Sequence, residues 1–223
     1  MIVLAYQFDW SVVTDRWRLF AAGAWVDLWV AALAFALACA LGLFFALLRT
    51  SGVRLFVIPS YLYVQVMRGV PLYVLLLWIY FGIANITGIL FTSFQAIVIA
   101  LALTGSGYTT EIFRAGLGAI DRGQMEAARS IGLSRLHTYR HVILPQAFRI
   151  VVPPLGNSFV GLLKGATIMA VIAVPDMVFH ANELNVTLFT PFEVFAAVGV
   201  ILIVMVLFFS ALVYLLERRL KIA

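Results

Sequence analysis

Two runs of apolar residues that contain no charged side chain, 28–48 and 194–216, constrain the fold of this chain most strongly. A helix needs about 20 consecutive apolar residues to cross the hydrocarbon core of a bilayer. Charged residues make up only 11% of the 223 residues, whereas soluble domains carry about 25%. The sequence therefore predicts an all-α polytopic membrane protein in which most side chains face lipid or other helices.

The remaining apolar stretches divide into three further spans. Arg68 is the only charged residue between 55 and 110, a stretch long enough for two helices. Asparagine and two glycines in 82–88 favour a turn between them. We expect a single domain of residues 1–223 with about five membrane helices, at 28–48, 57–81, 93–115, 153–174 and 194–216.

Prolines and tryptophans set the expected helix boundaries. Pro71 removes a backbone donor two residues after Gly69, which predicts a kink in the second helix. Val152-Pro153-Pro154 is expected to begin the fourth helix, because proline fits a first helical turn. Residues 1–27 hold three tryptophans and mixed charges, which suits an interfacial segment, and residues 176–193 are expected to form a loop.

Basic residues alternate between the connections of these helices. Loop 49–54, segment 114–149 and the C-terminal tail carry arginine or lysine, whereas 82–92 and 176–193 carry neither. Cytoplasmic loops of membrane proteins are enriched in these residues. Five spans satisfy the alternation, with the N-terminus outside and the C-terminus in the cytoplasm.

The composition argues against several classes of function. The net charge of +5 arises from loops and the tail, so it does not indicate nucleic-acid binding. A lone Cys39 makes no internal disulfide, and His137 and His141 lack a third metal ligand. No Gly-x-x-x-x-Gly-Lys-Ser/Thr motif is present to cradle ATP phosphates. We expect no metal, no cofactor, no catalytic residue and no ATP site in this chain.

A polar, basic and helix-favouring segment, Asp121 to Pro145, interrupts the apolar sequence. Glu126-Ala127-Ala128 is followed by Gly132 and then by Leu144-Pro145. This spacing resembles the cytoplasmic signature loop of ABC importer permeases of the polar amino acid (histidine/glutamine/arginine-type) family, with Val142 where isoleucine is usual. Other segments carry the resemblance in order: Phe8-Asp9-Trp10, Arg68 to Pro71, Tyr108 to Arg114, Pro153 to Asn157 and Leu216 to Lys221.

The resemblance implies a type I ABC importer transmembrane-domain fold and a permease subunit of the bacterial inner membrane. Such a subunit translocates a polar amino acid or a similar small zwitterion and is not itself an enzyme. The implied partners are a second permease subunit, identical or homologous, two copies of an ABC ATPase that bind ATP and Mg, and an extracytoplasmic solute-binding protein.

Residues 121–145, hereafter the knob, are expected to form two short helices joined at Gly132, within a cytoplasmic coupling loop at about 116–149. The resemblance implies that the knob enters a groove of the ATPase. The expected coupling residues are Glu126, Ala127, Ala128, Gly132, Leu133, Leu144 and Pro145. The alternative is a basic interfacial loop that has no partner.

Polar residues within the spans are candidates for a solute pathway, because charge inside a membrane is costly and usually faces the bundle interior. The candidates are Arg68, Gly69, Pro71, Thr104, Ser106, Tyr108, Lys164 and Thr167. Lys164 has three interpretations: it faces the pathway, pairs with a carboxylate of another helix, or snorkels. Arg68 either lines a gate or caps carbonyls freed by Pro71, and 104–108 either lines the pathway or packs helices closely.

Three details complete the expectations. Related chains commonly carry a polar residue where Gly165 stands, so the solute site is where the family pattern loosens. Glu111 and Arg114, at i and i+3, are expected to pair and support the knob. The rival functions are an ATP-independent channel or secondary carrier and a membrane enzyme, and the last lacks a catalytic constellation.

Overall fold

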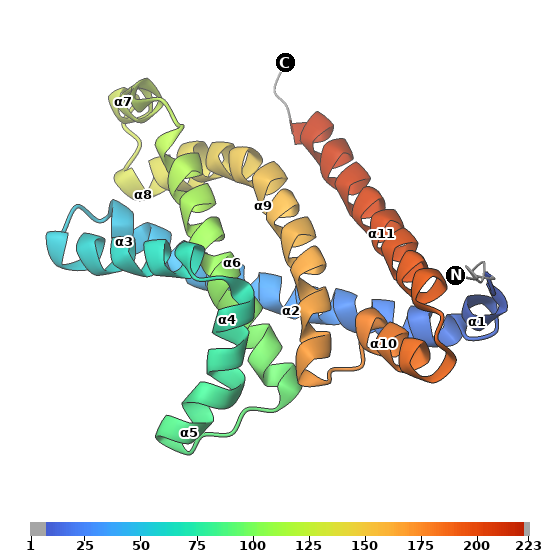
Figure 1. The fold of residues 1–223 in the computed structure, drawn as a ribbon. Coiled ribbons are helices and arrows are strands. Elements are labelled where there is room, and N and C mark those ends of the chain that lie inside the picture. The colour runs from blue at the N-terminus through green and yellow to red at the C-terminus, as the bar shows by residue number, and fades with distance from the viewer. Residues whose placement is uncertain (1–7, 221–223) are drawn as a thin grey trace, which may run out of the picture.

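The structure, a computed structural model, describes residues 8–220, and within that range the chain is helical without strands. The structure has three long helices, α2 (Trp17–Thr50), α6 (Ser93–Gly118) and α11 (Pro191–Leu220). A fourth long element is a composite helix that runs from Arg135 to Ile172. Figure 1 shows α6 crossing α2 near the middle of the molecule, with α11 standing to one side. Lys221 of the predicted basic tail lies outside the described residues.

The number of apolar helices agrees with the predicted membrane architecture. Four helices in the described residues are long and apolar enough to cross a membrane, and a bent pair makes a fifth if it counts as one span. The predicted helix at 93–115 corresponds to α6, which begins with a capping box: Thr92 Oγ1 accepts from the Gln95 N–H, and Gln95 Oε1 accepts from the Thr92 N–H.

The kink predicted near Pro71 is confirmed and is a sharp break. Helix α3 (Arg54–Gly69) ends there, and α4 (Leu72–Leu77), the π-helical turn η1 (Trp78–Gly82) and α5 (Ile83–Thr87) follow at an angle of 102°. Val70 and Pro71 are extended, with ψ of 126° and 134°. The turn expected over 82–88 is displaced, because Gly88 and not Gly82 adopts the positive φ, +73°, that ends a helix.

The expectation that the fourth helix begins at Val152–Pro154 is wrong. Helix α9 (Leu144–Ala166) continues from α8 (Arg135–Thr138) and the π-helical turn η2 (Tyr139–Ile143), so Pro145 occupies the first turn. Pro153 and Pro154 lie inside α9, where membrane helices tolerate proline. Figure 1 shows α9 curving along its first half, as expected when proline removes backbone hydrogen bonds. The 3₁₀ turn η3 (Thr167–Ile172) ends the span.

Two segments expected to lie outside the spans are largely helical. Helix α2 begins at Trp17, before the start predicted at residue 28, so residues 17–27 of the expected interfacial segment are continuous with the helix of the first span; α1 (Ser11–Thr14) precedes it. Nothing in 17–27 breaks a helix, and tryptophan preference alone does not end one. Residues 176–193 contain α10 (Met177–Leu188), because Asp176 caps its N-terminus by accepting a hydrogen bond from Phe179 N at 2.6 Å.

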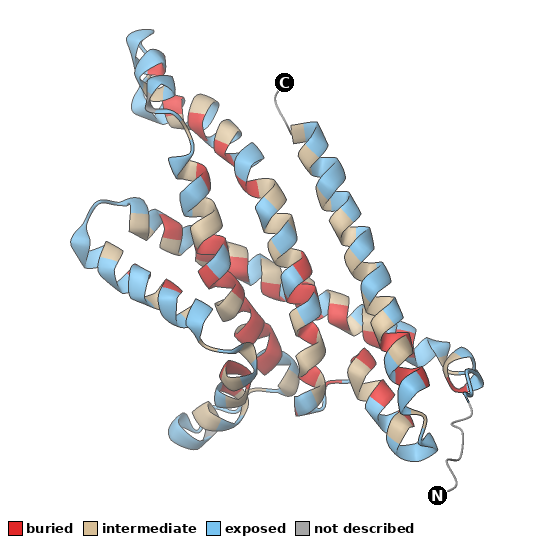
Figure 2. Cartoon of the chain, turned by 45° about the horizontal axis from the view of Figure 1, so that its top comes forward, coloured by how far each residue is buried: buried red, intermediate tan, exposed pale blue. Residues whose placement is uncertain are grey.

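Small residues let α2 and α6 approach closely at the centre of the molecule. Thr109 Oγ1 of α6 donates to the carbonyl of Ala38 in α2 at 2.7 Å. A Cβ on Gly105 would lie 2.9 Å from the Cβ of Ala38. Figure 2 shows the buried residues concentrated in the middle of α6 and along α2, while α11 is largely exposed. A second buried cluster joins α1, α2, α10 and α11.

Candidate functional site

The predicted helix–glycine–helix geometry of the knob is present. Helix α7 (Arg122–Ser130) is capped by Asp121, whose Oδ1 accepts from Gly123 N at 2.6 Å. It ends in a Schellman motif, in which Leu133 N donates to Ala128 O at 3.1 Å and Gly132 N donates to Arg129 O at 3.0 Å. Gly132 has a φ of +85°, a conformation that side chains with a Cβ rarely adopt.

The second helix of the knob starts at its own cap. Ser134 Oγ accepts from His137 N at 3.4 Å, and α8 then continues through η2 into α9. The helix expected over 133–144 is therefore the first part of the composite span. Figure 1 shows α7 and α8 projecting at one end of the molecule, beyond the long helices.

The knob exposes apolar side chains on both sides of Gly132. Ile131 is 78% exposed and Leu136 is 75% exposed. Glu126 and Ala127 are exposed, whereas Ala128 is buried. Ile131 and Leu136 were not among the coupling residues predicted from the sequence. Apolar residues inside an otherwise polar segment were the available signal, because such residues gain from a partner that removes them from water.

A cavity of about 800 Å³ separates the knob from the end of α2. Its walls come from the ends of α2 and α6, from α7 and from η2, and they include Arg49, Thr50, Arg114, Asp121, Met125, Glu126, Arg129, Tyr139 and Leu144. The coupling residues Glu126 and Leu144 thus face a space shared with cationic side chains of the long helices. The knob is joined to the bundle through α6 and η2, with room on the α2 side.

An ion-pair network stands on the opposite wall of this cavity. Arg114 Nε donates to Glu111 Oε2 at 2.8 Å, which confirms the predicted i, i+3 pair. Arg49 of α2 binds the other oxygen, Glu111 Oε1, and its guanidinium lies 5.3 Å from the ring centroid of Tyr61. The sequence did not indicate Arg49, because it lies 62 residues from Glu111.

Two of the solute-path candidates are brought together at the end of α3. The guanidinium of Arg68 lies 5.3 Å from the ring centroid of Tyr108 on α6, within the range of a cation–π interaction. Gly107 permits this approach, since a Cβ there would lie 2.9 Å from Arg68 Cγ. Arg68, Tyr108, Gly69 and Pro71 are all exposed in this chain.

Ser106 is buried, and Thr104 is partly buried with its hydroxyl inaccessible. The Ser106 Oγ lies 2.6 Å from the Tyr63 hydroxyl and 2.7 Å from the Leu103 carbonyl, to which it donates. Its hydrogen-bonding capacity is therefore used within the helices. Thr104 Oγ1 is buried without a partner in the described residues. Both positions fit the close-packing alternative in this chain.

Lys164 lies on the exposed side of α9. Within residues 8–220 it forms no ion pair, so the carboxylate partner that one interpretation required is not present there. Thr167 Oγ1 donates to the Lys164 carbonyl at 2.9 Å. Gly165 lies against Leu72 and Leu101, whereas a Cβ on Gly161 would have no atom within 4 Å. Of the two glycines, only Gly165 lies in a helix contact.

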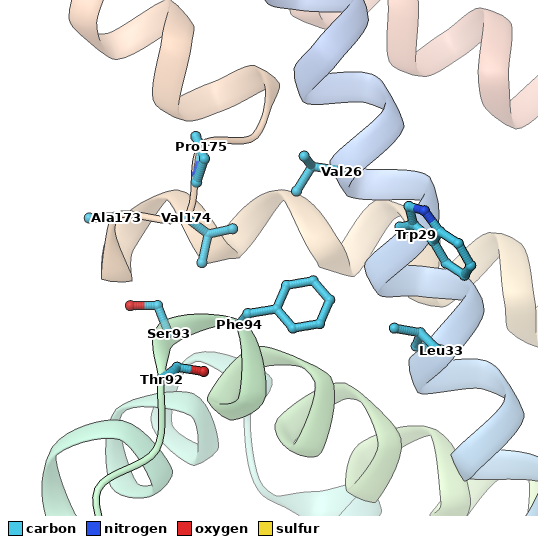
Figure 3. Close-up of a pocket in the computed structure, with 9 residues that line it drawn as sticks. All are labelled: Val26, Trp29, Leu33, Thr92, Ser93, Phe94, Ala173, Val174 and Pro175. Carbon is cyan, nitrogen blue, oxygen red and sulfur yellow. The ribbon is translucent and has the colours of Figure 1, made fainter.

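A pocket at the other end of α6 differs from the candidate solute path (Figure 3). It measures about 580 Å³ and is lined by Val26, Trp29, Leu33, Thr92, Ser93, Phe94, Ala173, Val174 and Pro175. No charged side chain is among these residues, so the pocket offers no counter-charge for a zwitterion.

His137 and His141 stack with ring centroids 5.6 Å apart, and the described residues contain no cluster of three or more metal-ligating side chains.

The helices and their connections define a type I ABC importer transmembrane fold. A crystal structure of an amino acid ABC transporter with histidines matches with a TM-score of 0.90 and 37% identity, covering 96% of this chain and all of that one. The MetNI methionine ABC transporter in an inward-facing conformation matches with a TM-score of 0.76. At 19% identity, the second likeness concerns the fold alone.

Sequence relatives identify the family. Residues 38–222 match the family described as "Binding-protein-dependent transport system inner membrane component", and the chain belongs to it. The probable glutamine ABC transporter permease protein GlnM of Bacillus subtilis is 33% identical over 95% of this chain and 97% of its own length. The glutamine transport system permease protein GlnP of Escherichia coli K12 is 33% identical over 97% and 99%. The chain is therefore a multi-pass permease of the bacterial cytoplasmic (inner) membrane.

Proposed function

We propose that this chain is the permease subunit of an ATP-driven importer for a polar amino acid or similar small zwitterion, coupled through the knob to a separate ATPase. In this proposal the ATPase subunits bind ATP and Mg, because the chain lacks a phosphate-binding motif. A second permease subunit completes the pathway, and the knob lies on the cytoplasmic side.

The exposed apolar side chains of the knob carry this proposal. Ile131 and Leu136 flank Gly132 on a segment that is rich in basic and polar residues and projects from the bundle. A bare basic loop would satisfy the charge pattern without exposing them. A groove on a protein partner would remove both from water, with each buried aliphatic side chain contributing about 1.5–3 kcal/mol. The exposed Ala127 allows the partner to approach closely.

The solute class is supported by the names of the relatives and by two cations. Two relatives that match over 95% and 97% of this chain are described as a probable glutamine permease and a glutamine permease. Arg68, which lies beside Tyr108, and Lys164, which forms no ion pair within residues 8–220, are exposed cations of a kind that binds a carboxylate readily. Arg68 lies on α3 and Lys164 lies on α9. In the proposal, the second permease subunit helps to close the pathway around them.

We further propose that a solute-binding protein docks on the two connections that lack arginine and lysine. Segment 82–92 exposes Ile86 and Leu90, and the end of α10 exposes Val186 and Phe189. Helix α10 gives the second connection a fixed shape, which a docking surface requires.

The test is uptake by the whole complex in vesicles, with the binding protein supplied outside and ATP inside. Glu126→Lys and Gly132→Asp are expected to abolish ATP-dependent uptake while the protein remains in the membrane. Gly52→Asp is the matched control, because Gly52 also has a positive φ, +75°, and open surroundings but lies in another basic loop. Uptake that survives both knob substitutions refutes the coupling role, and uptake without ATP or ATPase supports a channel or carrier.

A further inference from the structure

Helices α2 and α10 meet with their main chains in contact. A Cβ on Gly23 would lie 2.5 Å from Met177 N and 2.6 Å from the carbonyl carbon of Asp176. Only glycine permits this approach, so the first turn of α10 lies directly on α2. One turn further along α2, Asp27 points into the same contact.

The contact buries two carboxyl groups. Asp27 has no exposed surface, and neither of its oxygens has a hydrogen-bond partner in the described residues. Asp176 is also fully buried; its Oδ1 accepts from Phe179 N at 2.6 Å, but its Oδ2 has no partner. Three carboxyl oxygens are therefore buried without a donor.

In the part of the chain that the structure describes, no ion pair joins a cation to either carboxyl group. Asp176, another acid, is the charged group that acts on Asp27, and the Met177 N–H lies near it without completing a hydrogen bond. On α10, the His180 ring pairs with Glu183 at 3.4 Å. On α11, Glu193 accepts from the Asp9 N–H at 2.7 Å, and at the start of α2 the charge of Arg16 acts on Asp9. Asp15 and Arg18 are exposed.

Two ionised carboxylates cannot share a buried site without a counter-charge, because each loses its hydration and repels the other. A metal cation would need about six oxygen ligands. The side chains of Asp27 and Asp176 provide only three carboxyl oxygens without a partner in the described residues. A proton needs one donor oxygen and one acceptor, which two neighbouring carboxyl groups can provide.

We propose that Asp27 and Asp176 form a one-proton site, in which the carboxylic acid of Asp27 donates a hydrogen bond to Oδ2 of the Asp176 carboxylate. The proton resides on Asp27 because its buried carboxyl group has no hydrogen-bond partner within residues 8–220 and faces a second acid. The charge resides on Asp176 because the Phe179 N–H and the N-terminus of the 12-residue α10 stabilise it. Burial raises the pKa of Asp176 to about 6, against the lowering effect of backbone hydrogen bonds, so at pH 7 it still carries the charge.

The site makes the α2–α10 contact depend on one proton. Loss of this proton at alkaline pH leaves two buried negative charges at a contact where the main chains already touch. Their repulsion then drives α10 away from α2. The contact is expected to hold at neutral pH and to loosen as the shared proton is lost.

Infrared difference spectroscopy of the purified full chain tests this inference. At pH 7 the wild type is expected to show the C=O stretch of a protonated carboxyl group, and Asp27→Asn is expected to remove it. Asp176→Asn, which keeps the cap acceptor, is expected to retain the band at a shifted frequency. Asp121→Asn is the matched control, since it replaces an exposed cap aspartate and should leave the band unchanged.

Thermal unfolding of the same proteins between pH 6 and pH 10 provides the second measurement. The wild type is expected to lose stability at alkaline pH, and Asp27→Asn is expected to lose less, because its amide donates to Asp176 without a dissociable proton. A band that neither substitution changes refutes the site. Stabilisation by Na⁺ or Ca²⁺ that Asp27→Asn abolishes also overturns it, in favour of a metal cation.

Discussion

The crossing of α2 and α6 makes Gly42→Ala a sharp test of the packing argument. A Cβ on Gly42 would lie 2.0 Å from Thr109 Oγ1, 2.8 Å from Thr109 Cβ and 2.9 Å from Thr110 N. Two of these atoms belong to a branched side chain whose Oγ1 is already bonded to Ala38 O at 2.7 Å. The helices must therefore separate by roughly 1 Å to restore an ordinary van der Waals distance.

The cost of this separation follows from the contacts that it loses. The Thr109–Ala38 hydrogen bond contributes about 1 kcal/mol. Overpacking a tight contact typically costs about 1–3 kcal/mol. Alanine recovers about 1 kcal/mol through its higher helix propensity. The free energy of unfolding of Gly42→Ala is therefore expected to fall by about 1–3 kcal/mol.

Gly161→Ala is the control, because it makes the same substitution at a helical glycine that is exposed and not buried. Gly161 is helical, and a Cβ there would have no atom within 4 Å, so the propensity gain is unopposed. This variant is expected to be unchanged or up to about 1 kcal/mol more stable. Both are measured by reversible unfolding of the purified chain in mixed micelles with increasing sodium dodecyl sulfate. Equal stability of the two variants would refute the claim that α2 and α6 are closely packed at Gly42.

Two further predictions concern the knob and the network beside it. Gly132→Ala is expected to lower the free energy of unfolding by about 1 kcal/mol, and Gly132→Asn by less, because asparagine tolerates positive φ and the surroundings are open. Both are measured in the same unfolding assay. Equal losses would mean that lost side-chain contacts, and not backbone strain, destabilise the variants. A double-mutant cycle with Arg49→Gln and Glu111→Gln is expected to give a coupling energy of about 1 kcal/mol for this pair, whose side chains are 14% and 24% exposed, and strictly additive single effects would contradict the contact.

The sequence predicted those elements that local patterns specify. Helix α6 was placed within three residues, because its start is capped by Thr92 and its body is free of charge. The turn at Gly132 was predicted because a glycine between two helix-favouring runs commonly ends the first helix in a left-handed conformation. The break at Pro71 was predicted for the same kind of local reason, although not its angle.

Features that depend on contacts between distant helices were missed or misread. Asp27 was assigned to an interfacial segment by its neighbouring tryptophans, but it is buried beside the start of α10, which lies about 150 residues further along the chain. Pro153 was read as a helix start, because a sequence does not show that a preceding helix already runs through Pro145. The Arg49–Glu111 pair joins two helices whose crossing no local pattern specifies.

The cavity behind the knob has a mechanical consequence. Because a cavity lies on the α2 side, the knob is attached to the bundle at two places, the last turns of α6 and the η2–α9 junction. The two helices at these places pack closely, since a Cβ on Gly116 of α6 would lie 2.1 Å from Val151 Cγ1 of α9. If a partner displaces the knob as proposed, α6 and α9 are therefore expected to move together, and α2 is expected to follow through its contacts with α6.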